Sequence, residues 1–416
     1  MIHFDRHILS NGLTVLSHHD PNTPMATVNM LYRVGSRNEE TDKTGFAHLF
    51  EHLMFAGSAH APSFDEPLER AGGENNAFTN NDITNYYEVL PVENIETALF
   101  LESDRMQALN INENALEVQR KVVMEEFKEN YLNQPYGDTW HLLGKLAYKK
   151  HPYQWPTIGK KLSHIASATL QDVQSFFDRN YTVNNAILSI AGNLKPDQVF
   201  KLAEKWFGKI PAKSLEENFF PIEPIQRKER IKEVFADVPL DAIYMAFHMG
   251  NRNSLSYNFA DILTDILSGG KSSRLYQNLV QKKHIFNEID AYVTGYLDPG
   301  LLIIDGKPAQ GVDIHEAIHA VRIELNKLMT DKVGNHELQK IKNQIEADHE
   351  FEEIGQMNRA FSLAYFEMLG GVELMEKEKE HYRMATSSMI RDEARQIFRP
   401  INTSILMYRS KKNNTK

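Results

Sequence analysis

The sequence predicts an α+β protein made of two homologous repeats, each a mainly antiparallel sheet flanked by helices. Strand-like and helix-like segments alternate through the first half of the chain, and after a proline-containing segment the same order begins again. A chain of 416 residues also exceeds what one hydrophobic core usually supports, so about two domains are expected.

The first half begins with strands and continues into helices. The strand-like segments are 7–9, 13–16 after an Asn11-Gly12 turn, and 27–34. An apolar helix is expected within 45–57, followed by a hairpin whose strands are 76–79 and 83–89. Amphipathic helices over about 92–108, 112–132 and 170–179 and a strand over 186–192 complete the half.

A linker separates the two expected repeats. Segment 210–230 contains Pro211, Pro221 and Pro224 among mixed charges, which is typical of an interdomain connection. The expected domains are therefore 1–209 and 231–416.

The second repeat keeps the pattern of the first helix but not its polar residues. Segment 242–250 resembles the strand at 28–35, and 259–267 aligns with 46–54 without a gap. Asp261, Thr264 and Asp265 then stand where the first repeat has His48, Glu51 and His52. We expect the two aspartates to be exposed surface carboxylates. Further on, 335–368 is expected to form a long amphipathic helix without a chemical role.

Residues 48–52 read His-Leu-Phe-Glu-His and carry the strongest functional signal. Residues four apart lie on one face of a helix, so His48 and His52 can bind one metal ion together. Glu51 is close enough to act as a general base beside that ion. HxxEH is the inverted form of the HExxH zinc-peptidase motif.

The alternative for this motif is a pair of ordinary core histidines. Two imidazoles and a carboxylate in an apolar helix would then be buried without partners, at a cost of roughly 1–3 kcal/mol for each unsatisfied group. A bound metal removes that cost, so the pattern favours a metal site.

The amino-acid composition narrows the possible partners, metal ligands and cellular locations of the protein. A net charge of −10 without a basic cluster argues against nucleic acid as a partner, and no apolar run is long enough for a membrane span. Cysteine is absent, so any zinc must be held by histidine and carboxylate. No signal peptide is recognisable, which favours the cytoplasm and leaves the periplasm open.

A catalytic zinc ion usually has three protein ligands, and the third is expected within 119–130. Here the chain resembles the pitrilysin/insulinase family of inverzincins, in which a glutamate ends a run of the form Arg-x-x-Val-x-x-Glu. Arg120, Val123 and Glu126 fit that form, so the resemblance implies Glu126 as the third ligand. Glu125 and Glu129 are the local rivals; on a helix they face away from Glu126 or flank it.

The resemblance covers nearly the whole chain. It includes Gly35-Ser36-Arg37, 73–79 with 84–87, His151-Pro152-Tyr153 and 272–276, and its two-repeat length is similar to that of the processing-peptidase subfamily. It implies that Asn76, Ala77, Phe78 and Thr79 form an edge strand to which an extended peptide adds as a further strand.

Two departures from the family pattern are visible. Gln119 replaces a glutamate that supports the third ligand, and it can form hydrogen bonds without carrying a charge. In addition, Val280 and Asn287 occupy the positions of an Arg and a Tyr that hold the substrate carbonyl in the family. The resemblance therefore implies a paralogous partner that supplies this pair in a heterodimer, or else a homodimer.

Together these residues predict a zinc-dependent endopeptidase with one Zn²⁺ per chain, bound by His48, His52 and Glu126, with Glu51 as general base. Peptides or unfolded protein segments are the expected substrates. The alternatives are a non-catalytic peptide-binding or scaffold subunit of a family heterodimer, and a metallohydrolase that acts on something other than peptides.

Overall fold

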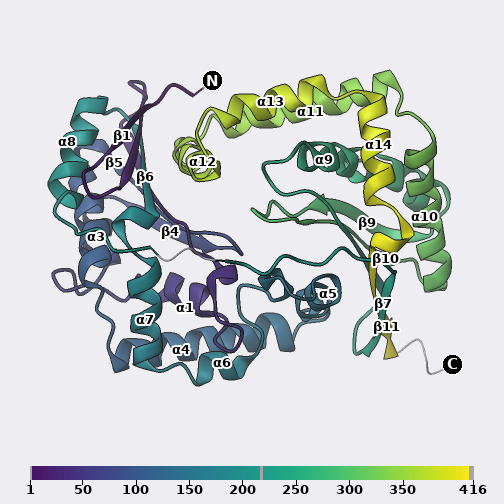
Figure 1. Ribbon diagram of the computed structural model, residues 1–416, viewed down its shortest axis with the longest axis horizontal. Coiled ribbons are helices and arrows are strands. Elements are labelled where there is room, and N and C mark those ends of the chain that lie inside the picture. The colour runs from purple at the N-terminus through teal and green to yellow at the C-terminus, as the bar shows by residue number, and fades with distance from the viewer. Residues whose placement is uncertain (1, 216–218, 412–416) are drawn as a thin grey trace. The chain divides into compact units, whose positions relative to one another are not determined.

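The computed structural model describes residues 2–215 and 219–411, so residues 216–218 of the expected linker lie outside the described part. The chain forms two compact units, each with its own sheet (Figure 1). Unit 1 comprises Met1–Lys128, Trp155–Phe220 and His349–Met375, and unit 2 comprises Glu129–Gln154, Pro221–Asp348 and Glu376–Lys416.

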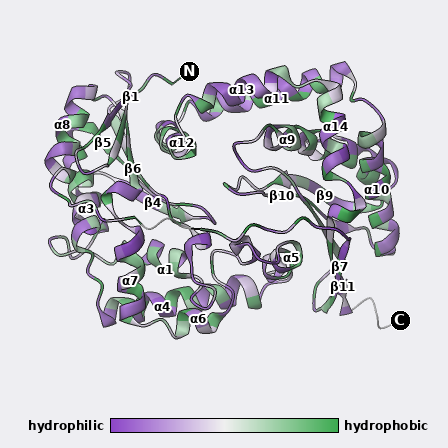
Figure 2. Ribbon diagram, in the orientation of Figure 1, coloured by the Kyte–Doolittle hydropathy of each residue, from purple (hydrophilic) through white to green (hydrophobic). Residues whose placement is uncertain are grey.

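Unit 1 is built on a six-stranded sheet in the order β1-β2-β6-β3-β5-β4. Only the β2–β6 pair is parallel among its strand pairs. The strands are β1 (Asp5–Ile8), β2 (Thr14–His19), β3 (Met25–Tyr32), β4 (Glu74–Thr79), β5 (Thr84–Pro91) and β6 (Ala186–Gly192). Strand β6 is buried along its whole length and is largely apolar (Figure 2), as expected for a strand covered on both faces.

Helices cover both faces of this sheet. The helices of unit 1 are α1 (Phe46–Leu53), α2 (Asp65–Arg70), α3 (Ile95–Ala108), α4 (Glu113–Phe127), α6 (Leu162–Ala166), α7 (Leu170–Asn180), α8 (Pro196–Phe207) and α12 (Gln356–Leu369). Leu31 of β3 packs with Leu363 of α12 on one face. Tyr86 of β5 lies on the opposite face, where its hydroxyl donates to the Phe50 carbonyl of α1 (3.3 Å).

Unit 2 is built on a five-stranded sheet in the order β7-β11-β8-β10-β9, in which only β7 and β11 are parallel. The strands are β7 (Arg230–Ala236), β8 (Ala242–His248), β9 (Phe286–Val293), β10 (Leu301–Pro308) and β11 (Thr403–Ser410). The helices that lie wholly or mostly in this unit are α5 (Thr139–Ala147), α9 (Leu255–Ser268), α10 (Ile314–Thr330), α11 (Asn335–Glu352), α13 (Leu374–Met384) and α14 (Ser387–Ile397).

Shorter helices join these elements. Two are π-helices, η3 (Lys128–Leu132) directly after α4 and η6 (Tyr276–Lys282). The 3₁₀ turns are η1 (Ser36–Asn38), η2 (Val92–Asn94), η4 (Pro152–Gln154), η5 (Val183–Asn185) and η7 (Pro400–Asn402).

The two sheets have the same topology once β1 is set aside. Strands β2, β6, β3, β5 and β4 correspond in order to β7, β11, β8, β10 and β9, and the parallel pair occupies the same place in both. Helix α1 follows β3 as α9 follows β8. The expected α+β duplication is therefore confirmed at the level of strand order.

The compact units differ from the continuous ranges 1–209 and 231–416. Helix α5, from the first half of the sequence, packs on the second sheet, where Leu143 and Ala147 join Leu301 and Ile303 in one cluster. Helix α12, from the second half, packs on the first sheet. Apolar periodicity identifies both helices but does not determine which sheet each one covers.

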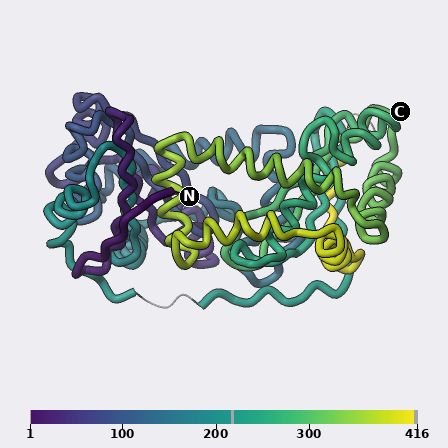
Figure 3. The backbone as a smooth tube through the Cα atoms, turned by 90° about the horizontal axis from the view of Figure 1, so that it is seen from above, coloured from purple at the N-terminus to yellow at the C-terminus, as the bar shows by residue number. Residues whose placement is uncertain are grey.

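The long helix expected over 335–368 is wrong as a single element. The chain forms α11 and α12 with a break at residues 353–355, before the Gly355 N-cap. The two helices also belong mainly to different units, α11 to unit 2 and α12 to unit 1. In unit 2, α11 lies beside α13 (Figure 3), and Lys342 donates to the Arg383 carbonyl (2.7 Å).

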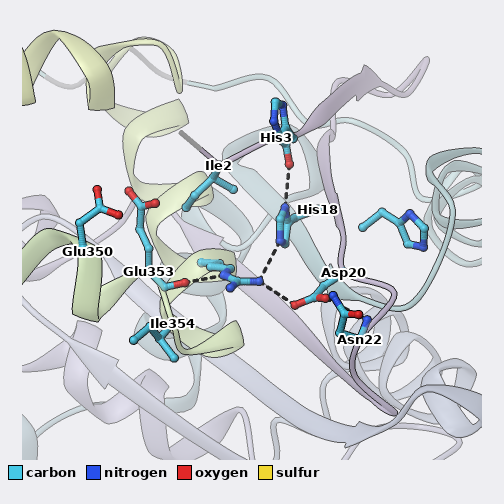
Figure 4. A pocket seen from close by; sticks show the side chains of 10 residues that line it. Ile2, His3, His18, Asp20, Asn22, Glu350, Glu353 and Ile354 are labelled. Atoms are coloured by element: carbon cyan, nitrogen blue, oxygen red, sulfur yellow. Dashed lines mark hydrogen bonds and ion pairs between the residues drawn. The ribbon is translucent and has the colours of Figure 1, made fainter.

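Polar contacts hold α12 on unit 1. Arg6 of β1 pairs with Glu367 of α12 at 2.5 Å. Arg359 donates to Asp20 Oδ2 (2.8 Å) and the Glu353 carbonyl (2.5 Å) and contacts His18 Nε2 at 3.1 Å (Figure 4). The first turn of α12 is thereby fixed to the end of β2.

Candidate metal centre

Helix α1 carries the HxxEH motif on its less buried side. Phe46, Ala47, Leu49, Phe50 and Leu53 are buried. His48, Glu51 and His52 are partly exposed, since the periodicity of the helix places them away from the apolar positions. The apolar residues therefore fix the helix in the core and leave the polar ones at its surface.

Helix α4 brings the third residue to this surface. Leu116, Val123 and Phe127 form its buried stripe, and α4 packs against α1. Asn112 caps the first turn by accepting from the Ala115 amide (3.0 Å). Glu126, beside the buried stripe, is directed towards the two histidines.

His48, His52 and Glu126 form a convergent set of donor atoms. Glu126 Oε2 lies 3.7 Å from His48 Nε2 and 3.5 Å from His52 Nε2. These separations are too long for good hydrogen bonds. They are close to the roughly 3.3 Å expected between ligands of a tetrahedral zinc ion with bonds near 2.0 Å. Residues 2–215 and 219–411 contain one group of three histidine, cysteine, aspartate or glutamate side chains whose donor atoms all lie within 4.8 Å of one another, and it is this group.

The electrostatics of the group suit a divalent cation. Burial lowers the pKa of His48, which favours the neutral imidazole that binds metals. The neighbouring His52 and, to a smaller extent, His48 lower the pKa of Glu126 and keep it ionised, although burial opposes this. Two histidines and one carboxylate are a donor set that zinc accepts in catalytic sites.

The rival carboxylates are elsewhere. Glu125 is largely exposed and pairs with Lys128 at 3.0 Å on the surface of α4. Glu129 is exposed beyond the end of α4. Neither belongs to the three-residue group.

Gln119 lies two helical turns before Glu126, on the same side of α4, and is partly exposed. In the described part of the chain no hydrogen bond joins it to the three donor residues, and His48 Nδ1 is buried without a partner. Its supporting role therefore stays a prediction.

The expected substrate strand is an edge strand. Residues 76–79 lie in β4, which pairs with β5 and has no strand on its other side among the described residues. Helix α1 contacts β4, so the motif helix and the sheet edge are neighbours. Phe78 packs edge-on against Phe361 of α12, with ring centroids 5.3 Å apart.

Unit 2 contains Val280 and Asn287, the two residues that depart from the expected family pattern. Val280 lies in η6 and packs against the core of the unit, and Asn287 is exposed on β9. Asp261 and Asp265 of α9 are half-buried, so the expectation of exposed carboxylates is wrong. Tyr382 donates to Asp261 at 2.7 Å, and burial together with Asp261 and Asp348 raises the pKa of Asp265 to about 7.

A separate pocket of about 430 Å³ opens on unit 1 beside α12 (Figure 4). Its lining includes His3, His18, Glu350, Glu353 and Arg359, and none of the three metal-centre residues.

Two residues near the site gave no signal in the sequence. Glu39 is buried next to the first turn of α1, and Phe361 supports β4 from a distant part of the chain. Neither has a spacing or motif that relates it to HxxEH.

Two family models and several known proteins match this chain. The family described as insulinase (peptidase family M16) matches residues 14–161, and the peptidase M16 inactive domain matches residues 167–345. The zinc protease PqqE of Helicobacter pylori is 33% identical over 351 residues, which cover 82% of this chain and 78% of that protein. The beta subunit of the mitochondrial-processing peptidase of Saccharomyces cerevisiae is 26% identical over 82% of this chain and 76% of its own length.

A crystal structure of a protease from Helicobacter pylori superposes with a TM-score of 0.92 and 27% identity, covering 98% of this chain and all of that one. The chain thus belongs to the M16 family of metallopeptidases, in its short, two-repeat form. In the part of the chain described, we find no helix that is both long and apolar enough to cross a membrane.

Proposed function

We propose that this protein is a zinc-dependent endopeptidase that hydrolyses peptides or unfolded protein segments. The convergence of His48, His52 and Glu126 beside Glu51 carries the proposal. The name zinc protease borne by its relative PqqE supports zinc as the ion.

Each side chain has a defined role in this reaction. His48, His52 and Glu126 would hold the zinc ion, which when bound would supply Lewis acidity to a water molecule and to the scissile carbonyl. Glu51 accepts a proton from the attacking water and transfers it to the leaving amine. The position of Glu51, one residue before His52 on the same partly exposed side of α1, supports this role.

The open edge of β4 is the proposed binding site for the peptide. An extended peptide would pair with β4 through main-chain hydrogen bonds, in which Asn76, Ala77, Phe78 and Thr79 take part. Such pairing depends little on side chains, so it suits peptides and unfolded segments better than folded proteins.

A partner subunit completes the proposal. Val280 and Asn287 supply neither a cation nor a phenol. The Arg/Tyr pair therefore has to come from a paralogous chain in a heterodimer. The alternative is a homodimer that works without such a pair. The relative from Saccharomyces cerevisiae is itself named as a subunit. The same two residues favour the second candidate function, a peptide-binding subunit that does not turn over substrate.

The deciding experiment combines zinc analysis with peptide cleavage. Wild-type protein, Glu51→Gln and Val280→Arg/Asn287→Tyr are each assayed with a quenched fluorescent peptide library at one bound zinc per chain. The peptidase is supported if the wild type cleaves the peptides and the Glu51→Gln variant does so at least a hundredfold more slowly. Turnover that appears only in the double variant supports the need for a partner.

If these proteins bind one zinc ion per chain and bind peptide, but none of them cleaves it, the proposal of a peptidase gives way to that of a non-catalytic subunit. A wild-type chain that binds no zinc would contradict the peptidase and leave only the non-catalytic subunit.

A further inference from the structure

The first turn of α1 has an unusual cap. The N-cap residue is Gly45, which has no side chain to accept hydrogen bonds from the first amides of the helix. The first intrahelical bond joins the Leu49 amide to the Gly45 carbonyl, so the amides of residues 46–48 need other partners.

Glu39, from another segment of the chain, provides a hydrogen-bond partner for these amides. Its Oε1 accepts from the Ala47 amide at 3.0 Å, and the amides of Gly45 and Phe46 also interact with its carboxyl group. Its Oε2 accepts from Trp155 Nε1 at 3.1 Å. Glu39 is only 7% exposed and Trp155 only 2%, so water does not compete for these bonds.

The surroundings fix this cap in place. Gly45 has φ +92°, and a Cβ there would come within 2.7 Å of the Ile158 carbonyl oxygen. Thr44 Oγ1 accepts from the Lys160 amide (2.7 Å) and contacts His164 Nδ1 (2.8 Å). The segment from Trp155 to His164 therefore holds both Glu39 and the residues that precede α1.

His48 is the residue after Ala47. A shift of the Ala47 amide moves the backbone that carries His48, and metal sites are sensitive to small displacements of their ligands. We propose that Glu39 is a positioning residue that caps the first turn of α1 and thereby sets the geometry of the metal-binding histidines. This inference rests on the proposed zinc site and adds a residue that does not touch the ion.

Glu39→Gln keeps the size of the side chain and replaces one acceptor oxygen by a donor NH₂ group. An amide has one acceptor and one donor side, and in either orientation its NH₂ group faces the Ala47 amide or the Trp155 indole N–H. Glu39→Ala removes both bonds.

The experiment measures zinc affinity by competition with a chromophoric chelator, using the full-length protein made metal-free and then titrated with zinc. We expect Glu39→Ala to weaken binding by ten- to a hundredfold, as for other groups that orient ligands. Glu39→Gln should lose less zinc affinity than Glu39→Ala. The double variant Glu39→Gln/Trp155→Phe should regain part of that affinity, because the indole N–H that would face the NH₂ group of the glutamine is gone. Glu40→Gln is the control, since Glu40 is exposed and pairs with Arg179 on the surface.

The readouts separate positioning from a purely structural role. If the folded Glu39→Ala protein binds zinc as tightly as the wild type and only its free energy of unfolding falls, the inference is overturned. If Glu39→Ala does not fold, wild-type affinity in Glu39→Gln likewise overturns it. A wild-type chain without zinc affinity would refute the zinc site itself, whereas an intact wild-type site with unaffected variants refutes only the role of Glu39.

Discussion

Phe361 of α12 packs edge-on against Phe78 of β4, with ring planes at 70° and centroids 5.3 Å apart. Tyr365 stacks on Phe361 one turn later, at 5.6 Å. A helix from the second half of the sequence thus supports the edge strand that we propose to bind peptide.

Phe361→Ala should weaken peptide binding by loosening this edge. The aromatic pair is worth about 1 kcal/mol beyond the buried area, so we expect roughly a fivefold rise in the dissociation constant of a fluorescent peptide. The Glu51→Gln background prevents turnover during the measurement. Phe351→Ala is the control, because Phe351 is 72% exposed. Equal effects of the two substitutions would contradict the supporting role.

Removal of the metal should distinguish the two adjacent glutamates of α4. Zinc at a thousand times its dissociation constant stabilises a folded protein by about 4 kcal/mol, so a chelator should lower the melting temperature of the wild type. Glu126→Gln should abolish this zinc-dependent stabilisation. Glu125→Gln should keep it, because Glu125 pairs with Lys128 on the surface. Differential scanning fluorimetry with and without zinc checks both, and a normal zinc response in Glu126→Gln would remove Glu126 from the ligand set.

The stability of the protein should depend on pH through Glu39. Its pKa is near 4.5 in the unfolded chain and rises to about 8 in the folded protein because it is buried. Between these values the folded state holds a proton that unfolding releases, so the contribution of Glu39 is complete below pH 4.5 and is lost as the pH rises through 8. The total loss is on the order of a few kcal/mol.

Urea unfolding of the metal-free wild type and Glu39→Gln from pH 5 to 9 measures this effect. The wild type should lose stability relative to the variant as the pH rises, because the variant has no proton to release at this position. Glu40→Gln should follow the wild type. Parallel curves for wild type and Glu39→Gln would show that the carboxyl group titrates normally.

A buried charge cluster supports the other end of α1. Arg105 is fully buried, binds Glu102 through Nε at 3.0 Å, and lies 3.6 Å from Glu88. Its guanidinium also lies over the Tyr86 ring at 4.3 Å, and Tyr86 donates to α1.

Arg105→Met should cost about 3–5 kcal/mol of unfolding free energy, since it leaves two buried carboxyl groups without a cation. Arg70→Met, which breaks the exposed pair with Glu66, should cost less than about 1 kcal/mol. Chemical denaturation gives both values. A loss in Arg105→Met as small as that in Arg70→Met would mean that Glu88 and Glu102 do not need the cation.

Much of this protein follows from local sequence patterns. The periodicity of 45–57 indicated α1, and the strands and hairpin of the first half appear close to their expected positions. His48 and His52 are four residues apart, so any helix there places them together. The resemblance to the pitrilysin/insulinase family, and not spacing alone, implied Glu126, which the structure brings to both histidines.

The sequence-based predictions are wrong where contacts between distant segments of the chain determine the structure. The long helix over 335–368 breaks before Gly355, and its second part covers the first sheet. Asp261 and Asp265 occupy helix positions that look like a solvent-exposed side, but packing around α9 buries them by half.

The sequence by itself determined the duplication, the helix with its two histidines and the chemical character of the metal site, because these depend on spacing along one chain segment. Only the tertiary structure decided that α5 and α12 pack on the sheets of the opposite halves, that Phe361 supports β4, and that Glu39 caps α1. Those contacts join residues far apart in the sequence, and burial of matching apolar surfaces in three dimensions selects them.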